Sequence, residues 1–79
     1  MKENKQVENL LNELIAMQQK KLLACGQKLV PRLTEEDILQ PNDYPLLDNN
    51  PLFRYEEGVL IGIKSVQSAL FALLKDPVT

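Results

Sequence analysis

The sequence predicts a small all-α protein built as an antiparallel helical hairpin with a short helix in its connection. Apolar residues recur at helical spacing over residues 3–30 and again from about 50 to 75. The 20 residues between these segments, 31–50, are rich in proline and in other residues that end regular structure. A chain of 79 residues holds one domain, so we expect residues 1–79 to form a single helical-hairpin domain.

The first helix is expected over residues 3–30. Its apolar stripe consists of Leu11, Ile15, Leu22, Cys25 and Leu29. Pro31 ends the helix, because a residue before proline is pushed out of the α region. If Gly26 is a C-cap, the helix ends earlier, so both Cys25 and Val30 stay open as its last residue. Gln18 interrupts the stripe, either to fix the register of an oligomer or where the side chain reaches water.

The connection carries signals of a short helix over residues 34–40. Thr34 suits the N-cap, and Asp37 stands where a capping box has its acid. Leu33 and Ile38 have the spacing of a hydrophobic staple. Further apolar residues follow, so we expect the connection to fold back over one end of the helices.

The second helix is expected to begin with Asn50 as N-cap and Pro51 as first helical residue, and to run to about Lys75 before Pro77. Polar residues occupy only a narrow part of its circumference. One stripe holds the large residues Val59, Ile63, Val66, Leu70 and Leu73. A second stripe holds the small residues Gly58, Gly62, Ser65, Ala69 and Ala72, which allow another helix to approach closely.

A helix that is apolar around most of its circumference must be buried around most of it. The small stripe either seats the first helix or contacts another chain, and the large and small stripes cannot both face the first helix. We therefore expect a partner. The simplest partner is a second copy in a two-fold homodimer that forms a four-helix bundle, since two-fold dimers are the commonest oligomers.

Composition argues against several classes of function. The chain has no histidine and a single cysteine, Cys25, so we expect no internal disulfide, no metal, no cofactor and no enzymatic activity. A net charge of −2 argues against nucleic-acid binding. The apolar runs of the second helix, residues 58–63 and 69–74, are short for a membrane span, and no signal peptide is evident. We therefore expect a cytoplasmic protein that does not bind membranes.

A possible docking surface consists of Tyr44, Phe53, Arg54 and Tyr55, residue types enriched at interfaces. The favoured alternative is that Phe53 and Tyr55 pack the first turns of the second helix against the connection. We therefore interpret the chain as a non-enzymatic protein-interaction module that self-associates through the second helix and can dock another protein. Two alternatives stay open: an accessory or chaperone-like subunit of a hetero-complex, and a small enzyme or ligand-binding dimer with an inter-subunit pocket near Tyr44, Arg54 and Tyr55.

Overall fold

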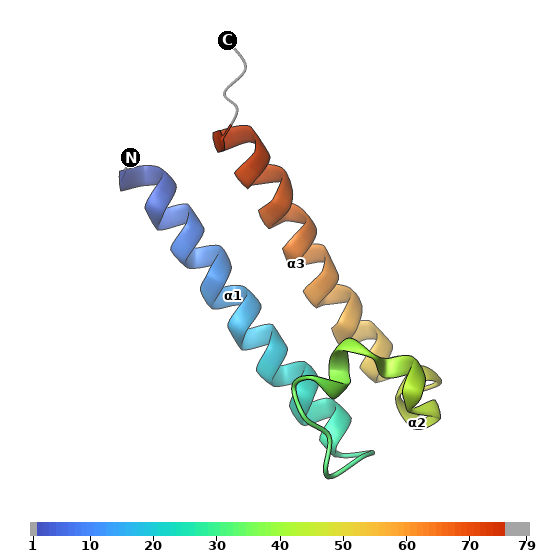
Figure 1. Cartoon of the computed structure of the whole chain (residues 1–79). Coiled ribbons are helices and arrows are strands. Elements are labelled where there is room, and N and C mark those ends of the chain that lie inside the picture. The colour runs from blue at the N-terminus through green and yellow to red at the C-terminus, as the bar shows by residue number, and fades with distance from the viewer. Residues whose placement is uncertain (1, 76–79) are drawn as a thin grey trace.

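The computed structural model describes residues 2–75, and within them every regular element is helical. Two long helices, α1 (Lys2–Gln27) and α3 (Pro51–Lys75), lie side by side and run in opposite directions (Figure 1). Between them come two 3₁₀ turns, η1 (Asp37–Leu39) and η2 (Pro41–Asp43), and the single-turn helix α2 (Pro45–Asp48). The molecule is a rod of 48 × 19 × 18 Å.

The caps expected from the sequence are present. The backbone N–H of Phe53 donates to the side-chain oxygen of Asn50 at 2.8 Å, so Asn50 caps α3 and Pro51 is its first residue. Thr34 and Asp37 bond reciprocally, because each backbone N–H donates to the other's side-chain oxygen, at 3.0 and 3.3 Å. This capping box precedes a 3₁₀ turn at 37–39 rather than the expected helix over residues 34–40. Pro77 lies outside the described residues.

The helix α1 ends at Gln27, between the two ends that the sequence left open. Gly26 is not a left-handed C-cap, because no glycine among the described residues has a positive φ. Instead the connection passes close over it. A Cβ at Gly26 would lie 2.5 Å from Leu33 Cδ2 and 3.2 Å from Phe53 Cε1. Glycine therefore stands here because the chain returns across α1 at this point.

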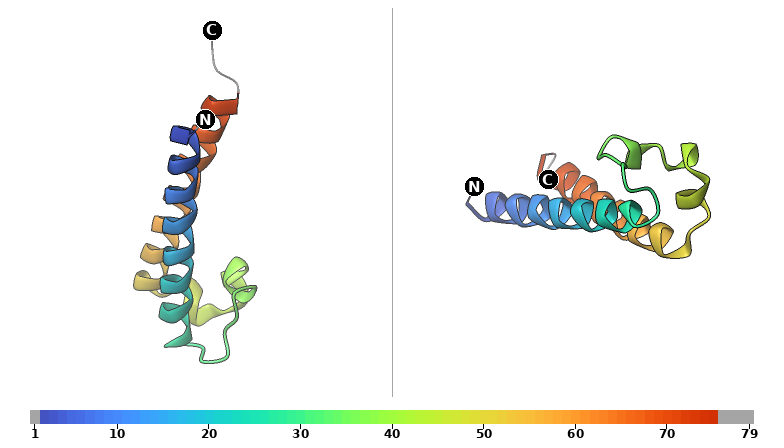
Figure 2. Two further views of the ribbon diagram at one scale, coloured as in Figure 1. Left: turned by 90° about the vertical axis from the view of Figure 1, so that its left-hand side faces the viewer. Right: turned by 90° about the horizontal axis from the view of Figure 1, so that it is seen from below.

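The connection folds back over one end of the helix pair, as expected, and we call residues 28–50 the arm. The arm lies on one face of the layer formed by α1 and α3 (Figure 2). Its apolar side chains complete a core whose members come from both long helices and from the arm: Leu22, Leu33, Ile38, Leu47, Phe53 and Leu60. The core is therefore concentrated at the arm end of the rod.

Two side-chain pairs give the register of α1 against α3. The amide of Gln18 donates to the backbone oxygen of Glu56 at 3.0 Å and to its carboxylate at 2.8 Å. The amide of Gln67 donates to Asn12 at 2.9 Å. Gln18 is thus buried and paired within the chain, which corrects both earlier interpretations: it neither reaches water nor is free to fix the register of an oligomer.

The stripe of α3 that faces α1 is not the large-residue stripe identified from the sequence. Residues at alternating steps of three and four are buried or half-buried: Phe53, Glu56, Leu60, Ile63, Gln67, Leu70 and Leu74. The side chains of Val66 and Leu73, from the expected stripe, are 53% and 58% exposed. Steps of three and four are typical of two helices that pack along a coiled-coil-like seam.

Candidate protein-interaction surfaces

The face of the α1–α3 layer opposite the arm is not covered by any other element, and we call it the open face (Figure 2). Successive residues of a helix point about 100° apart. In each long helix, the residues just to one side of those that contact the other helix therefore project to the open face. In α1 these are Leu10, Leu14 and Met17, and in α3 they are Val59, Val66 and Leu73. All but Val59 are exposed, and Val59 is half-buried. The open face is therefore an apolar surface made by both long helices.

Few charged groups interrupt this surface. Between Glu57 and Lys75 the only charged residue of α3 is Lys64, and helical geometry places it on the arm side of the layer. At the arm end, Lys21 pairs with the Glu56 carboxylate at 3.7 Å, so both charges are satisfied within the chain. A surface that is apolar over this length is unusual in a protein that acts alone.

The small-residue stripe of α3, formed by Gly58, Gly62, Ser65, Ala69 and Ala72, is exposed throughout. A Cβ placed at Gly58 or at Gly62 would meet nothing within 4 Å. In this structure the stripe therefore does not seat α1, which removes one of its two interpretations. It extends the apolar surface from the open face around the outer edge of α3.

The exposed area is large for a chain of this mass. The accessible surface is 6039 Å². A folded monomer of 9.0 kDa would expose about 4,850 Å² by the usual scaling of area with mass. The excess is on the order of 1,000 Å², and a standard protein–protein interface buries about 800 Å² on each partner.

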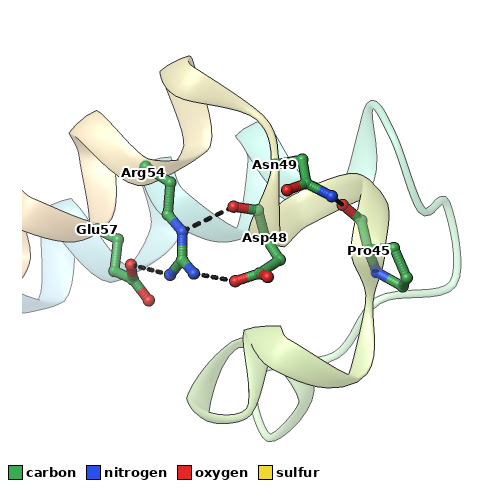
Figure 3. Close-up of polar contacts among 5 residues, drawn as sticks. All are labelled: Pro45, Asp48, Asn49, Arg54 and Glu57. Carbon is green, nitrogen blue, oxygen red and sulfur yellow. Dashed lines mark hydrogen bonds and ion pairs between the residues drawn. The ribbon is translucent and has the colours of Figure 1, made fainter.

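The four residues of the aromatic docking hypothesis lie in different surroundings. Phe53 is fully buried in the core, as the alternative interpretation expected, and Tyr44 packs half-buried against that core. Tyr55 is exposed rather than packed. Arg54 bonds to the Asp48 and Glu57 carboxylates, which ties α2 to the first turns of α3 (Figure 3). The hydrogen bond to Glu57 and both neighbouring carboxylates raise the pKa of Arg54. These residues therefore do not form one continuous surface.

A groove of about 420 Å³ lies on the arm side of the layer, between α1, η1 and α3. It is lined by Gln19, Leu22, Glu35, Glu36, Ile38, Leu39, Glu57, Leu60, Ile61 and Lys64. Sequence reasoning missed this groove, because its walls come from three separate segments. The only signals were the acidic composition of the arm and two apolar residues, Leu39 and Ile61, beside polar ones.

The remaining features concern metal binding, the free cysteine and the apolar character of α3. Over the part of the chain that the structure describes, no three His, Cys, Asp or Glu residues are placed to hold a metal ion. Cys25 is half-buried and packs against the core. Residues Pro51–Leu74 of α3 are long and apolar enough to cross a membrane by length and composition. Core helices of soluble proteins pass the same test when they are mostly buried, but only 6% of this stretch is buried within the chain. Comparison with protein-family models, curated proteins and solved structures finds no match to the chain.

Proposed function

We propose that this protein is a non-enzymatic interaction module whose open face binds the open face of a second copy. Two helical hairpins packed in this way form a four-helix bundle. The observation that carries the proposal is the uncovered apolar surface made by Leu10, Leu14 and Met17 of α1 with Val66 and Leu73 of α3. Large exposed apolar surfaces mark interaction sites, because covering them with another apolar surface removes apolar area from water.

A second copy fits this surface better than other occupants do. The excess area is of the size that one partner buries in a standard interface. In a two-fold dimer the same patch serves on both sides, so a self-complementary apolar surface needs no second kind of chain. The small stripe at the edge of α3 would let the backbones of two copies approach closely. In the alternative in which the protein is an accessory subunit of a hetero-complex, a different polypeptide covers the same face.

A lipid surface is the remaining competitor, because α3 passes the composition test for a membrane span. Contacts within the chain argue against full insertion. The buried pair of Gln18 and Glu56 holds α3 against α1, a helix with four lysines and three glutamates. Charged side chains at the centre of a bilayer are costly, by about 2.5–3.5 kcal/mol each on insertion scales.

The enzyme alternative gains no support from geometry. The groove on the arm side is not lined by Tyr44, Arg54 or Tyr55, the residues around which an inter-subunit pocket was expected. Arg54 already bonds two carboxylates of its own chain. We therefore retain the interaction module as the proposed function.

Light scattering during gel filtration tests the proposal. We expect a mass about twice the 9.0 kDa of one chain. Val66→Asp should give a folded monomer, because it places a charge at the centre of the open face. Ser68→Asp, a substitution of equal charge at an exposed site on the polar side of α3, should leave the dimer intact. A wild-type protein that is monomeric in solution would overturn self-association. A monomer that floats with phosphatidylcholine vesicles would overturn it too.

The small stripe has its own test. Gly62→Leu should weaken assembly far more than Ser68→Leu, since Gly62 lies beside the open face and nothing in its own chain fills the space above it. Circular dichroism checks that both variants remain helical. Equal dimer stability in the two variants would show that close approach at Gly62 is not used.

A further inference from the structure

We infer that the groove between η1, α1 and α3 binds a basic amphipathic helix of another protein. This site lies on the face of the layer opposite the proposed dimer surface, so one molecule can use both at once. The inference therefore goes beyond self-association. It gives the module a second partner and names that partner's chemistry.

The groove has an apolar floor and an apolar rim. Leu22, Ile38 and Leu60 are buried and form the floor. Leu39 on the arm and Ile61 on α3 line the same groove but are 67% and 57% exposed. Two large apolar side chains on different elements thus remain open to solvent around a single hollow. A volume of about 420 Å³ lies in the range of sites that bind ligands or the anchoring side chains of a peptide.

The charge around the groove selects a cationic occupant. Three carboxylates, Glu35, Glu36 and Glu57, line it against one ammonium group, that of Lys64. Glu57 is paired with Arg54 at 2.7 Å, whereas Glu35 and Glu36 are exposed and make no ion pair within the described residues. Residues 31–57 as a whole hold seven acids and two arginines. A partner with lysine or arginine beside its apolar anchors would complement this field.

The groove favours a helix over an extended peptide. An extended peptide is usually recognised by adding a strand to the edge of a sheet, and residues 2–75 contain no sheet. A polyproline II ligand docks in an aromatic-lined groove, and no aromatic residue lines this one. The helix-in-groove mode, with apolar anchors at helical spacing, is therefore the one that fits. The chain's own basic helix, α1, already places its apolar stripe against α3. The occupant is therefore a helix of a different protein.

The test uses a labelled peptide of about 18 residues, five helical turns, with leucine along one face and lysine elsewhere. A second peptide replaces every lysine by glutamate. Fluorescence anisotropy should show that the lysine peptide binds the wild-type protein and that the glutamate peptide does not. Raising the salt concentration should weaken binding, because the attraction is between exposed charges.

Matched variants locate the site. Leu39→Ser should weaken binding about five- to tenfold, as the loss of an apolar anchor contact does. Leu46→Ser is its control, since Leu46 is equally exposed on the arm but does not line the groove. The double variant Glu35→Gln and Glu36→Gln should weaken binding about two- to fivefold at low salt. Asp43→Asn, an exposed acid outside the groove, should change it little.

The outcomes separate this inference from the proposed function. Groove variants should remain dimers, and the Val66→Asp monomer should still bind the lysine peptide. Equal binding of both peptides, or equal losses in the control variants, would overturn the groove as the site. Loss of peptide binding in Val66→Asp with none in Leu39→Ser would place the peptide on the open face instead.

Discussion

The two ends of the rod differ in how many elements cover the seam between α1 and α3. Over residues 18–60, at the arm end, the arm adds a second layer, and Leu22, Leu47 and Phe53 are fully buried. Toward the other end, over residues 5–17 and 61–74, the two helices are alone and only Leu11 is buried. The comparison shows that the second end leaves most of its apolar side chains half-buried or exposed, whereas the arm end buries them.

The largest expected effect comes from removing the aromatic side chain at the centre of the arm end. Phe53→Ala should lower the free energy of unfolding by about 3–5 kcal/mol, since it leaves a cavity among Leu22, Leu47 and Gly26. A change of this size is a large part of the stability of any small domain. Urea unfolding followed by circular dichroism measures it.

Leu52→Ala is the control for Phe53→Ala, because Leu52 precedes it on α3 but is exposed. A small effect at Leu52 with a large one at Phe53 would locate the core at the arm end. Similar losses in the two variants would contradict the contrast between the two ends.

A smaller effect is expected where the two ends meet, at the buried pair of Gln18 and Glu56. Gln18→Ala should cost about 1–3 kcal/mol, because the mostly buried Glu56 side chain loses the amide that bonds it at 2.8 Å. Its remaining side-chain partner is Lys21, at 3.7 Å. Gln19→Ala, one residue along α1, should cost much less.

A double-mutant cycle sharpens this result. Replacing Gln18 and Glu56 together by leucine should cost less than the sum of the single changes, since no polar group is then left unpaired. Additive costs in urea unfolding would show that the two side chains act independently.

The features that could be predicted from the sequence depend mainly on residues close to one another in the chain. The caps at Asn50 and at Thr34 depend on side chains within three residues of the groups they bond, so they could be identified without knowledge of the fold. Four residues of the apolar stripe expected for α1, Leu11, Ile15, Leu22 and Cys25, are buried or half-buried on that helix, whereas Leu29 lies beyond its end at Gln27. The return of the arm followed from its apolar content.

The buried face of α3 could not be predicted in the same way. Its apolar residues surround most of the helix, so no face is singled out by composition alone. The choice depends on polar partners far along the chain: Glu56 meets Gln18, and Gln67 meets Asn12. The reason for glycine at position 26 could not be predicted for a related reason, since the contact that requires glycine comes from Leu33 on the returning arm. The groove likewise exists only after three segments come together.

The smallest expected effect lies in the arm itself, at Asp37. The backbone N–H of Thr34 donates to the Asp37 carboxylate at 3.0 Å, and this bond, followed by the nearby Thr34 hydroxyl, holds the pKa of Asp37 below its ordinary value of 3.8. A lowered pKa stabilises the folded state above the unfolded-state pKa, and this contribution is lost as pH falls through the lower folded-state value. The free energies of unfolding of the wild type and of Asp37→Asn should therefore converge as pH falls below about 3.8.

Because Asp37 is only half-buried and solvent screens its charge, we expect the convergence to be slight compared with the effect of Phe53→Ala. Thermal unfolding of both proteins between about pH 5 and pH 2 measures it. A constant difference over this range would show that the capping box does not favour the ionised carboxylate. A large difference would mean that the arm depends on this turn for its position over Gly26, and that the second layer at the arm end is held by the capping box as well as by apolar packing.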